Sequence, residues 1–178
     1  MQAIVLYGSH YGTTKAYAEY IAGALGCPAA AAQDVTRRDL EAIDTVVFGG
    51  GVYAGSIAEW SKAARLYEEN DKKKWVLFVC GLADPAKQKA QSEARALFEK
   101  KLPATAAGTL PVFCLRGGID YARLNVKHRA MMAMLIGFLK RKKDPSEEDR
   151  QLLATYGGRV DFLDLASAQP VIDAAKGT

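Results

Sequence analysis

The sequence predicts an α/β fold in which one parallel sheet of five strands lies between two layers of helices. Five short runs rich in β-branched and apolar residues recur along the 178-residue chain, most of them separated by amphipathic segments of helix length. The strong runs are nearly continuous in apolar residues, which is typical of strands that helices cover on both faces. This repeated strand–helix order calls for parallel strands joined by right-handed crossovers.

The five runs differ in strength. Four are rich in large apolar residues, whereas the run at 29–34 is dominated by alanine, which is a poor strand former. We keep it as a strand because two helical segments otherwise follow each other with no strand between them. The predicted strands are residues 3–7, 29–34, 45–50, 75–80 and 111–116, and the helical patterns lie at 13–25, 37–43, 57–70 and 86–102.

The regular alternation stops after residue 116. Helical patterns and turn signals then follow one another, and we interpret about 117–158 as an insert near the fifth strand of one domain spanning 1–178. The segments are 117–118 (turn), 125–143 (helix), 144–146 (turn and cap), 147–156 (helix), 159–162 (short run) and 165–176 (helix).

The composition excludes several classes of protein. With 49% hydrophobic and 25% charged residues the chain is ordinary for a globular protein, and its longest apolar stretch, 130–139, is too short to cross a bilayer. The N-terminus carries no signal-peptide pattern. Cys27, Cys80 and Cys114 form no CxxC pair, so we expect no disulfide framework, no metal site and a cytoplasmic location.

The loop after the first expected strand is the strongest functional signal. A strand, a short loop and a helix in succession bring free backbone N–H groups and the positive end of a helix dipole to one point, which suits an anion such as phosphate. Hydroxyl side chains add donors, and a glycine permits close backbone approach. The loop consists of Ser9, His10, Tyr11, Gly12, Thr13 and Thr14.

Other phosphate loops fit this segment poorly. The residues from Gly8 to Lys15 match neither the GxxxxGK[ST] pattern of P-loop NTPases nor the GxGxxG pattern of dinucleotide-binding folds. The alternative left open is that Ser9, Thr13 and Thr14 only cap the first helix.

The loop resembles the phosphate loop of the flavodoxin family, whose pattern [ST]-x-[TSY]-G-x-[TS] the residues 9–14 match directly after the first strand. The resemblance implies a flavodoxin-like three-layer sandwich with strand order 2-1-3-4-5 and FMN as the cofactor. It also implies that two further loops contact the flavin ring, with Tyr53 either stacked on the ring or exposed in a turn. These loops contain Gly50, Gly51, Val52, Tyr53, Ala54 and Gly55, and Cys80, Gly81, Leu82, Ala83 and Asp84.

Within this family the chain is most similar to the branch of menaquinone-dependent protoporphyrinogen dehydrogenases, which carry a basic helical insert near strand five. The second ring loop has no aromatic residue, so either the ring is covered on one face only or Tyr121 of the insert covers the other face. The resemblance implies an oxidoreductase that passes electrons from a small organic donor through FMN to a quinone, as in heme biosynthesis. The alternatives are a flavodoxin-type electron carrier and a flavodoxin-like binding module without flavin.

The insert concentrates the positive charge of the chain. Residues 116–143 hold eight basic side chains and one acidic one, although the whole chain has a net charge of only +4. The helix at 125–143 either lies on an anionic membrane surface, at the inner face of the cell membrane, or packs its apolar stripe on the domain core. Nothing supplies base-reading elements for nucleic acid. We expect His10 to be a loop donor and His128 a solvated helix residue, and we name no catalytic residue.

Overall fold

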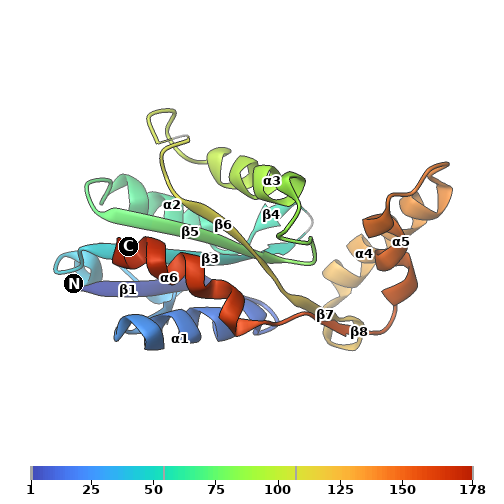
Figure 1. The fold of residues 1–178 in the computed structure, drawn as a ribbon, viewed down its shortest axis with the longest axis horizontal. Coiled ribbons are helices and arrows are strands. Elements are labelled where there is room, and N and C mark those ends of the chain that lie inside the picture. The colour runs from blue at the N-terminus through green and yellow to red at the C-terminus, as the bar shows by residue number, and fades with distance from the viewer. Residues whose placement is uncertain (1, 54, 107, 178) are drawn as a thin grey trace.

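The five predicted apolar runs form the central sheet. The computed structural model describes residues 2–53, 55–106 and 108–177, and its main sheet has the parallel order β2-β1-β3-β5-β6 (Figure 1). This is the predicted order, since a sixth strand, β4, only pairs antiparallel with the end of β3. The strands are β1 (Ala3–Gly8), β2 (Ala29–Ala31), β3 (Thr45–Tyr53), β4 (Ser56–Ile57), β5 (Lys74–Gly81) and β6 (Val112–Arg116).

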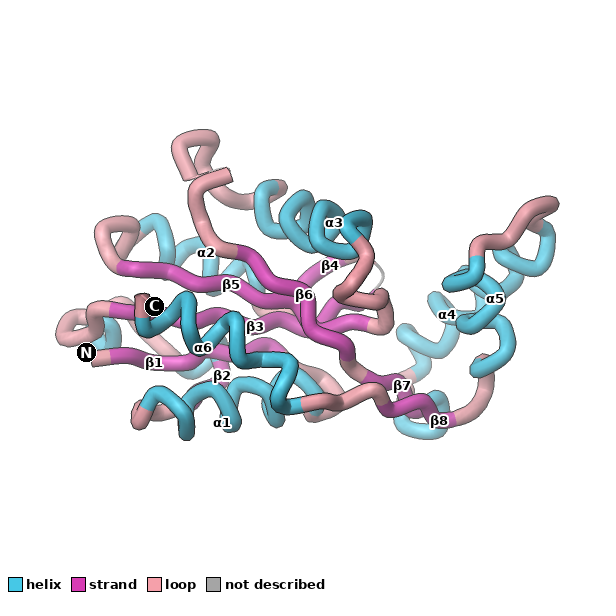
Figure 2. The backbone as a smooth tube through the Cα atoms, viewed as in Figure 1, coloured by secondary structure: helices cyan, strands magenta, loops and turns pink. Residues whose placement is uncertain are grey.

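Helices cover both faces of this sheet, as the continuous apolar runs predict (Figure 2). Alternate residues of β1 lie on opposite faces of the sheet: Val5 belongs to the core under the first and last helices along the chain, and Leu6 belongs to the core under the two helices that contain Trp60 and Phe98. The indole N–H of Trp60 donates to the carbonyl oxygen of Phe98 at 3.0 Å, which joins the helix that Trp60 begins to the helix that contains Phe98. The helices are α1 (Thr13–Leu25), α2 (Trp60–Glu68), α3 (Gln88–Glu99) and α6 (Gln169–Lys176).

The helix predicted at 37–43 is wrong. Within this range the structure has one 3₁₀ turn, at Arg38–Leu40, and no α-helix. The Thr36 backbone N–H and hydroxyl both donate to the Asp39 carboxylate at 2.7 Å, so a side chain closes the turn locally. The strand predicted at 29–34 is likewise shorter, because Ala32–Asp34 forms another 3₁₀ turn.

The insert forms an arm, defined here as residues 118–161, that projects beyond the carboxyl ends of the strands (Figure 1). Two short antiparallel strands, β7 (Gly118–Asp120) and β8 (Arg159–Asp161), make its base. They carry α4 (Val126–Arg141) and α5 (Glu147–Thr155), which pack against each other. The arm therefore leaves and rejoins the core through one narrow ribbon.

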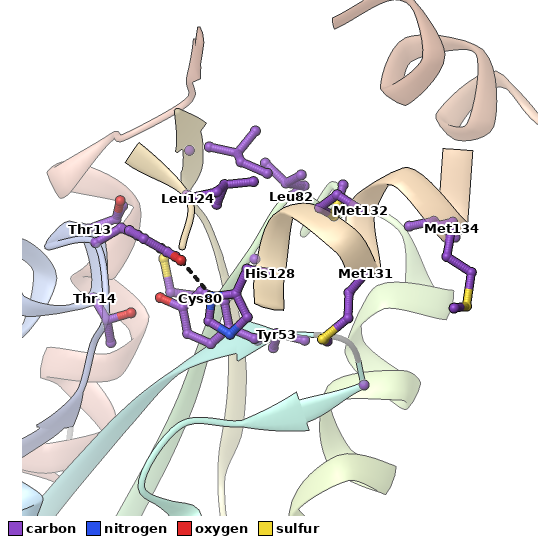
Figure 3. Close-up of a pocket in the computed structure, with 18 of the residues that line it drawn as sticks. Thr13, Thr14, Tyr53, Cys80, Leu82, Leu124, His128, Met131, Met132 and Met134 are labelled. Carbon is purple, nitrogen blue, oxygen red and sulfur yellow. Dashed lines mark hydrogen bonds between the residues drawn. The ribbon is translucent and has the colours of Figure 1, made fainter. Parts of the chain in front are cut away.

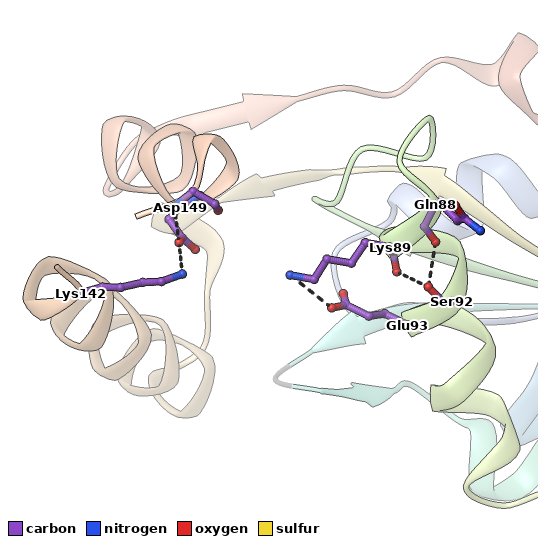
Figure 4. Close-up of polar contacts among 7 residues, drawn as sticks. Gln88, Lys89, Ser92, Glu93, Lys142 and Asp149 are labelled. Carbon is purple, nitrogen blue, oxygen red and sulfur yellow. Dashed lines mark hydrogen bonds and ion pairs between the residues drawn. The ribbon is translucent and has the colours of Figure 1, made fainter. Parts of the chain in front are cut away.

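Local polar contacts define the helices of the arm. The Asn125 side chain caps α4 by accepting the His128 backbone N–H at 2.8 Å. Ser146 and Asp149 form a reciprocal capping box at the start of α5. Asp149 also pairs with Lys142 at 2.5 Å, while Lys89 and Glu93 pair separately on α3 (Figure 4). In the part of the chain that the structure describes, no helix has the length and hydropathy needed to cross a membrane.

Candidate functional site

The loop between β1 and α1 holds an unusual backbone conformation. Gly12 has φ of +97°, in the left-handed region, and a Cβ placed on it would meet nothing within 4 Å. Its conformation, and not lack of space, therefore requires glycine here. The Gly12 N–H donates to the Ser9 hydroxyl at 3.1 Å, which closes the loop on itself.

The start of α1 presents unused N–H groups. Ala16 makes the first bond of the helix, donating to the Gly12 carbonyl at 2.9 Å. The backbone N–H groups of Thr13, Thr14 and Lys15 make no hydrogen bond within the described residues. No side chain caps this helix, so the alternative in which Ser9, Thr13 and Thr14 serve only as caps does not describe the loop. Free donors at a positive helix end, with no acidic residue from Gly8 to Lys15, suit a phosphate.

A cleft of about 640 Å³ opens beside this loop, between the carboxyl ends of β1, β3 and β5 and the arm (Figure 3). None of the residues that line it is Asp, Glu, Lys or Arg, and most are apolar. The lining residues are Tyr11, Thr13, Thr14, Val52, Tyr53, Gly55, Cys80, Gly81, Leu82, Gly117, Gly118, Ile119, Leu124, His128, Met131, Met132, Met134, Leu135 and Phe138.

The cleft brings together the three predicted loops. Nine of the predicted site residues line it: Tyr11, Thr13, Thr14, Val52, Tyr53, Gly55, Cys80, Gly81 and Leu82. Ser9, His10 and Gly12 belong to the loop before α1 without lining the cleft, and Gly50 and Gly51, expected in a loop, lie inside strand β3.

The remaining predicted residues lie elsewhere. Ala83 and Asp84 line a separate cavity of about 240 Å³ that faces α5 of the arm. Ala54 lies outside the described residues. Tyr121 does not line the cleft: it is buried within the arm, with its ring 5.0 Å from that of Tyr156.

Cys80 lies deep in the cleft at the end of β5. Burial raises the pKa of its thiol to about 12, partly opposed by a hydrogen bond with the Thr14 side chain. The thiol is therefore neutral at physiological pH and behaves as a small apolar group. A Cβ on Gly117 would lie 2.7 Å from the Cys80 sulfur, so only glycine fits where the chain leaves β6.

Four aromatic side chains lie close together beside the loop between β1 and α1. The rings of Tyr53 and His128 are stacked, with centroids 5.1 Å apart and planes 4° apart (Figure 3). The His10 ring lies 4.8 Å from Tyr53, and the Tyr11 ring lies 5.7 Å from His128. The His10 backbone N–H donates to the Tyr53 hydroxyl at 3.2 Å, which holds the half-buried Tyr53 in place. Tyr53 is thus part of the site and not a tyrosine exposed in a turn.

The expectation that His128 is a solvated helix residue is wrong, because His128 lines the cleft and bonds to Tyr11. The arm does bring an aromatic ring to the cleft, but the ring is that of His128, not Tyr121. One signal was available: His128, Met131 and Leu135 follow the i, i+3, i+7 spacing of one helix face. That face borders the cleft, whereas Ile136 and Leu139 are the buried residues of α4.

The residues present fit FMN. The unused N–H groups and hydroxyls at the start of α1 suit its phosphate, and the uncharged cleft beside them suits its ring. Gly81 lines the cleft, and a Cβ there would make an ordinary contact with Val52 at 3.7 Å.

Comparisons with known proteins agree with this architecture. The sequence model of the flavodoxin domain family matches residues 4–146, which is more than half of the chain. No curated protein matches significantly.

Three flavodoxins are among the solved structures that this chain matches. Oxidised flavodoxin 2 from Bacillus cereus is 19% identical, covering 65% of this chain and 84% of that protein, with a TM-score of 0.43. An archaeal flavodoxin is 14% identical, covering 86% and 95%, with a TM-score of 0.43. The two-electron reduced flavodoxin of Megasphaera elsdenii is 15% identical, covering 65% and 85%, with a TM-score of 0.45. On the family match and the strand order above, this chain belongs to the flavodoxin family, whose domains bind FMN.

Proposed function

We propose that this protein is an FMN-dependent oxidoreductase that moves electrons from a small organic donor to a quinone, in the manner of the quinone-dependent protoporphyrinogen dehydrogenases. The observation that carries the proposal is the arm. One apolar face of its helix α4 lies beside the flavin loops. Together with the carboxyl edge of the sheet, this face encloses a cleft of about 640 Å³. A wall of this kind suits a small molecule better than a docking protein.

The chain's own residues have distinct tasks in this proposal. The N–H groups of Thr13, Thr14 and Lys15 hold the phosphate, and Tyr53 lies beside the ring. The aliphatic and methionine side chains of α4 limit the access of water. FMN, when bound, supplies the electron-accepting ring, and the protein supplies position and environment.

The lining selects the class of substrate. Burying a charged group without a partner costs several kcal/mol, and no lining residue is Asp, Glu, Lys or Arg. An uncharged cyclic molecule with much apolar surface, such as a quinone, therefore fits the cleft. A porphyrinogen donor would place its carboxylates outside the apolar wall, where the exposed Arg123 and Lys127 of the arm supply cations.

A one-electron carrier is the second candidate, and membership of the flavodoxin family favours it. Charge separates the two candidates, because steering to a protein partner requires a surface of complementary charge close to the flavin. Here the basic residues are on the outside of the arm, and the cleft wall beside the flavin loops is uncharged. The flavin site therefore lacks the charged surface that a protein carrier requires. A flavin-free binding module is disfavoured by the family match.

The test uses FMN-loaded protein and steady-state reduction of 1,4-naphthoquinone, with protoporphyrinogen as the donor in a parallel assay. Met131→Asp puts a carboxylate in the cleft wall, and Val126→Asp puts one on an exposed end of α4 outside the lining. We expect Met131→Asp to raise KM for the quinone by about tenfold or more and Val126→Asp to leave it unchanged. Equal effects, or electron transfer only to protein acceptors, would support the carrier instead.

We also propose that the arm contacts the anionic inner face of the cell membrane from the cytoplasm, where quinones are concentrated. Phe138 and Met134 are 68% and 77% exposed, and the last residues of α4 and the two that follow it, Lys140 to Lys143, are all basic. Flotation with anionic vesicles tests this contact. Lys140→Gln with Lys143→Gln should reduce binding several-fold, and Lys100→Gln with Lys101→Gln on the core is the matched control. No flotation of the wild type would remove the proposal.

A further inference from the structure

The hydroxyl of Tyr11 is held by two groups of the arm. It lies 2.5 Å from Nδ1 of His128 and 3.4 Å from the backbone nitrogen of Asn125. The backbone N–H can only donate, so the hydroxyl oxygen accepts that bond. The single proton of the hydroxyl is then left for His128, and Tyr11 donates to Nδ1.

This arrangement fixes the tautomer of His128. A neutral imidazole carries one proton, and a ring whose Nδ1 accepts a bond must carry that proton on Nε2. Burial lowers the pKa of His128, and the neighbouring His10 and Lys127 lower it further, which keeps the ring neutral near pH 7. Within the described residues Nε2 has no hydrogen-bond partner. Its N–H group is therefore unused.

The arm side of the cleft is otherwise apolar. The lining residues that the arm contributes are Gly118, Ile119, Leu124, His128, Met131, Met132, Met134, Leu135 and Phe138, and His128 is the single polar side chain in this set. On the core side, the Tyr53 hydroxyl accepts the His10 N–H, and the Thr14 hydroxyl bonds to Cys80. One oriented donor in an apolar wall is the usual means by which a pocket selects a ligand by a single acceptor atom.

We propose that His128 is a substrate-positioning residue whose Nε2–H donates to a ring carbonyl oxygen of the quinone-class substrate, with Tyr11 fixing the donor tautomer. This inference rests on the proposed function. A quinone carbonyl gains negative charge as the ring is reduced, so a donor aimed at that oxygen favours reduction as well as binding. A site built around such a donor also discriminates against an analogue that lacks the acceptor.

A matched pair of ligands tests the donor without turnover. 1,4-Naphthoquinone and naphthalene share the fused ring, but only the first has carbonyl oxygens. Titration calorimetry on the oxidised, FMN-loaded protein gives the preference of the cleft for the quinone over naphthalene. The loss of one hydrogen bond should reduce this preference about five- to tenfold in His128→Phe, which keeps a ring to stack on Tyr53.

Two further variants separate the donor from simple packing. His128→Gln retains an N–H donor without the imidazole, and we expect it to keep most of the preference. Tyr11→Phe removes only the hydroxyl that fixes the tautomer, and we expect a fall of about two- to fivefold. In steady state, the ratio of the naphthoquinone rate to the ferricyanide rate should fall in the same order, because ferricyanide has no ring carbonyl.

The outcomes are distinct. If wild type binds naphthoquinone and His128→Phe keeps the same preference over naphthalene, the role assigned to His128 is wrong while the proposed function stands. If wild type binds neither ligand, the cleft does not take a quinone, and the proposed function and this inference fail together.

Discussion

The core and the arm of this protein treat the same kinds of residue in opposite ways. Phe48, Phe78 and Trp75 in the sheet are at most 1% exposed, whereas Phe138 and Met134 in the arm are 68% and 77% exposed. The core residues are enclosed by helices on both faces of the sheet. The apolar residues of α4 are enclosed only in part, by α5 and by the edge of the cleft. The exposed apolar residues of α4 therefore contribute little to folding and are available for contact with other molecules.

Matched truncations should reveal the largest difference between the two regions. Phe48→Ala removes a ring packed against Trp60 and Phe98, with centroids 5.4 and 6.2 Å away. We expect it to cost about 3–5 kcal/mol of unfolding free energy, since buried aromatic truncation leaves a cavity. Phe138→Ala should change the same quantity by less than about 0.5 kcal/mol. Urea denaturation measures both, and a loss above about 2 kcal/mol for Phe138→Ala would show that the arm is part of the folding core.

The same difference explains what the sequence could and could not predict. Four of the five strands were predictable because each is rich in large apolar residues, such as Val46, Val47 and Phe48, whose burial is decided by the sheet alone. The alanine-rich β2 was predicted only from the alternation of strands and helices. The helix expected at 37–43 was not, because one Thr36–Asp39 contact competes with helical bonds within a single turn. His128 was placed in solvent because its contacts depend on how the arm folds back toward the loop of Tyr11. Helical spacing puts His128 on the same face as Met131 and Leu135, but it does not say what that face contacts.

Glycine flanks both ends of α1, with Gly12 in the phosphate loop beside the cleft and Gly26 at the opposite end of the helix. Gly12 and Gly26 both have positive φ, +97° and +65°, and both have open space for a Cβ. Alanine at either position should therefore cost a similar 1–2 kcal/mol, roughly, of backbone strain. Only Gly12→Ala should also weaken FMN binding, by about tenfold, because its strain falls on the phosphate loop.

Fluorescence titration with FMN distinguishes the two variants, because free FMN fluorescence is quenched on binding. Gly26→Ala is the control for general destabilisation. An equal loss of FMN affinity in both variants would mean that the loop conformation at Gly12 has no specific part in holding the phosphate.

The helix cap at Ser146 tests whether the arm unfolds independently of the core. Ser146→Ala removes the hydroxyl that accepts the Asp149 N–H and should destabilise α5 by about 1 kcal/mol. Because the arm joins the core through one narrow ribbon, we expect amide hydrogen exchange to accelerate about fivefold in α4 and α5 alone. Equal acceleration in β1, β3 and β5 would show that the arm and the core unfold as one cooperative unit.

The smallest expected effect is the pH dependence that His128 brings to the contact between arm and core. Its pKa in the folded protein is lowered from 6.5, first by burial and then by His10 and Lys127, so the unfolded chain binds more protons as the pH falls. The stability that depends on neutral His128 is thus present above pH 6.5 and is lost as the pH falls through the lowered folded pKa. Protonation also removes the acceptor for the Tyr11 hydroxyl.

Melting temperatures between about pH 8 and pH 5 should fall more in wild type than in His128→Phe. Asp39 and Asp149, whose pKa values are lowered from 3.8, titrate below this window. Parallel curves for the two proteins would show that protonation of His128 does not weaken the contact between the arm and the core. The arm would then be held over the cleft by packing alone.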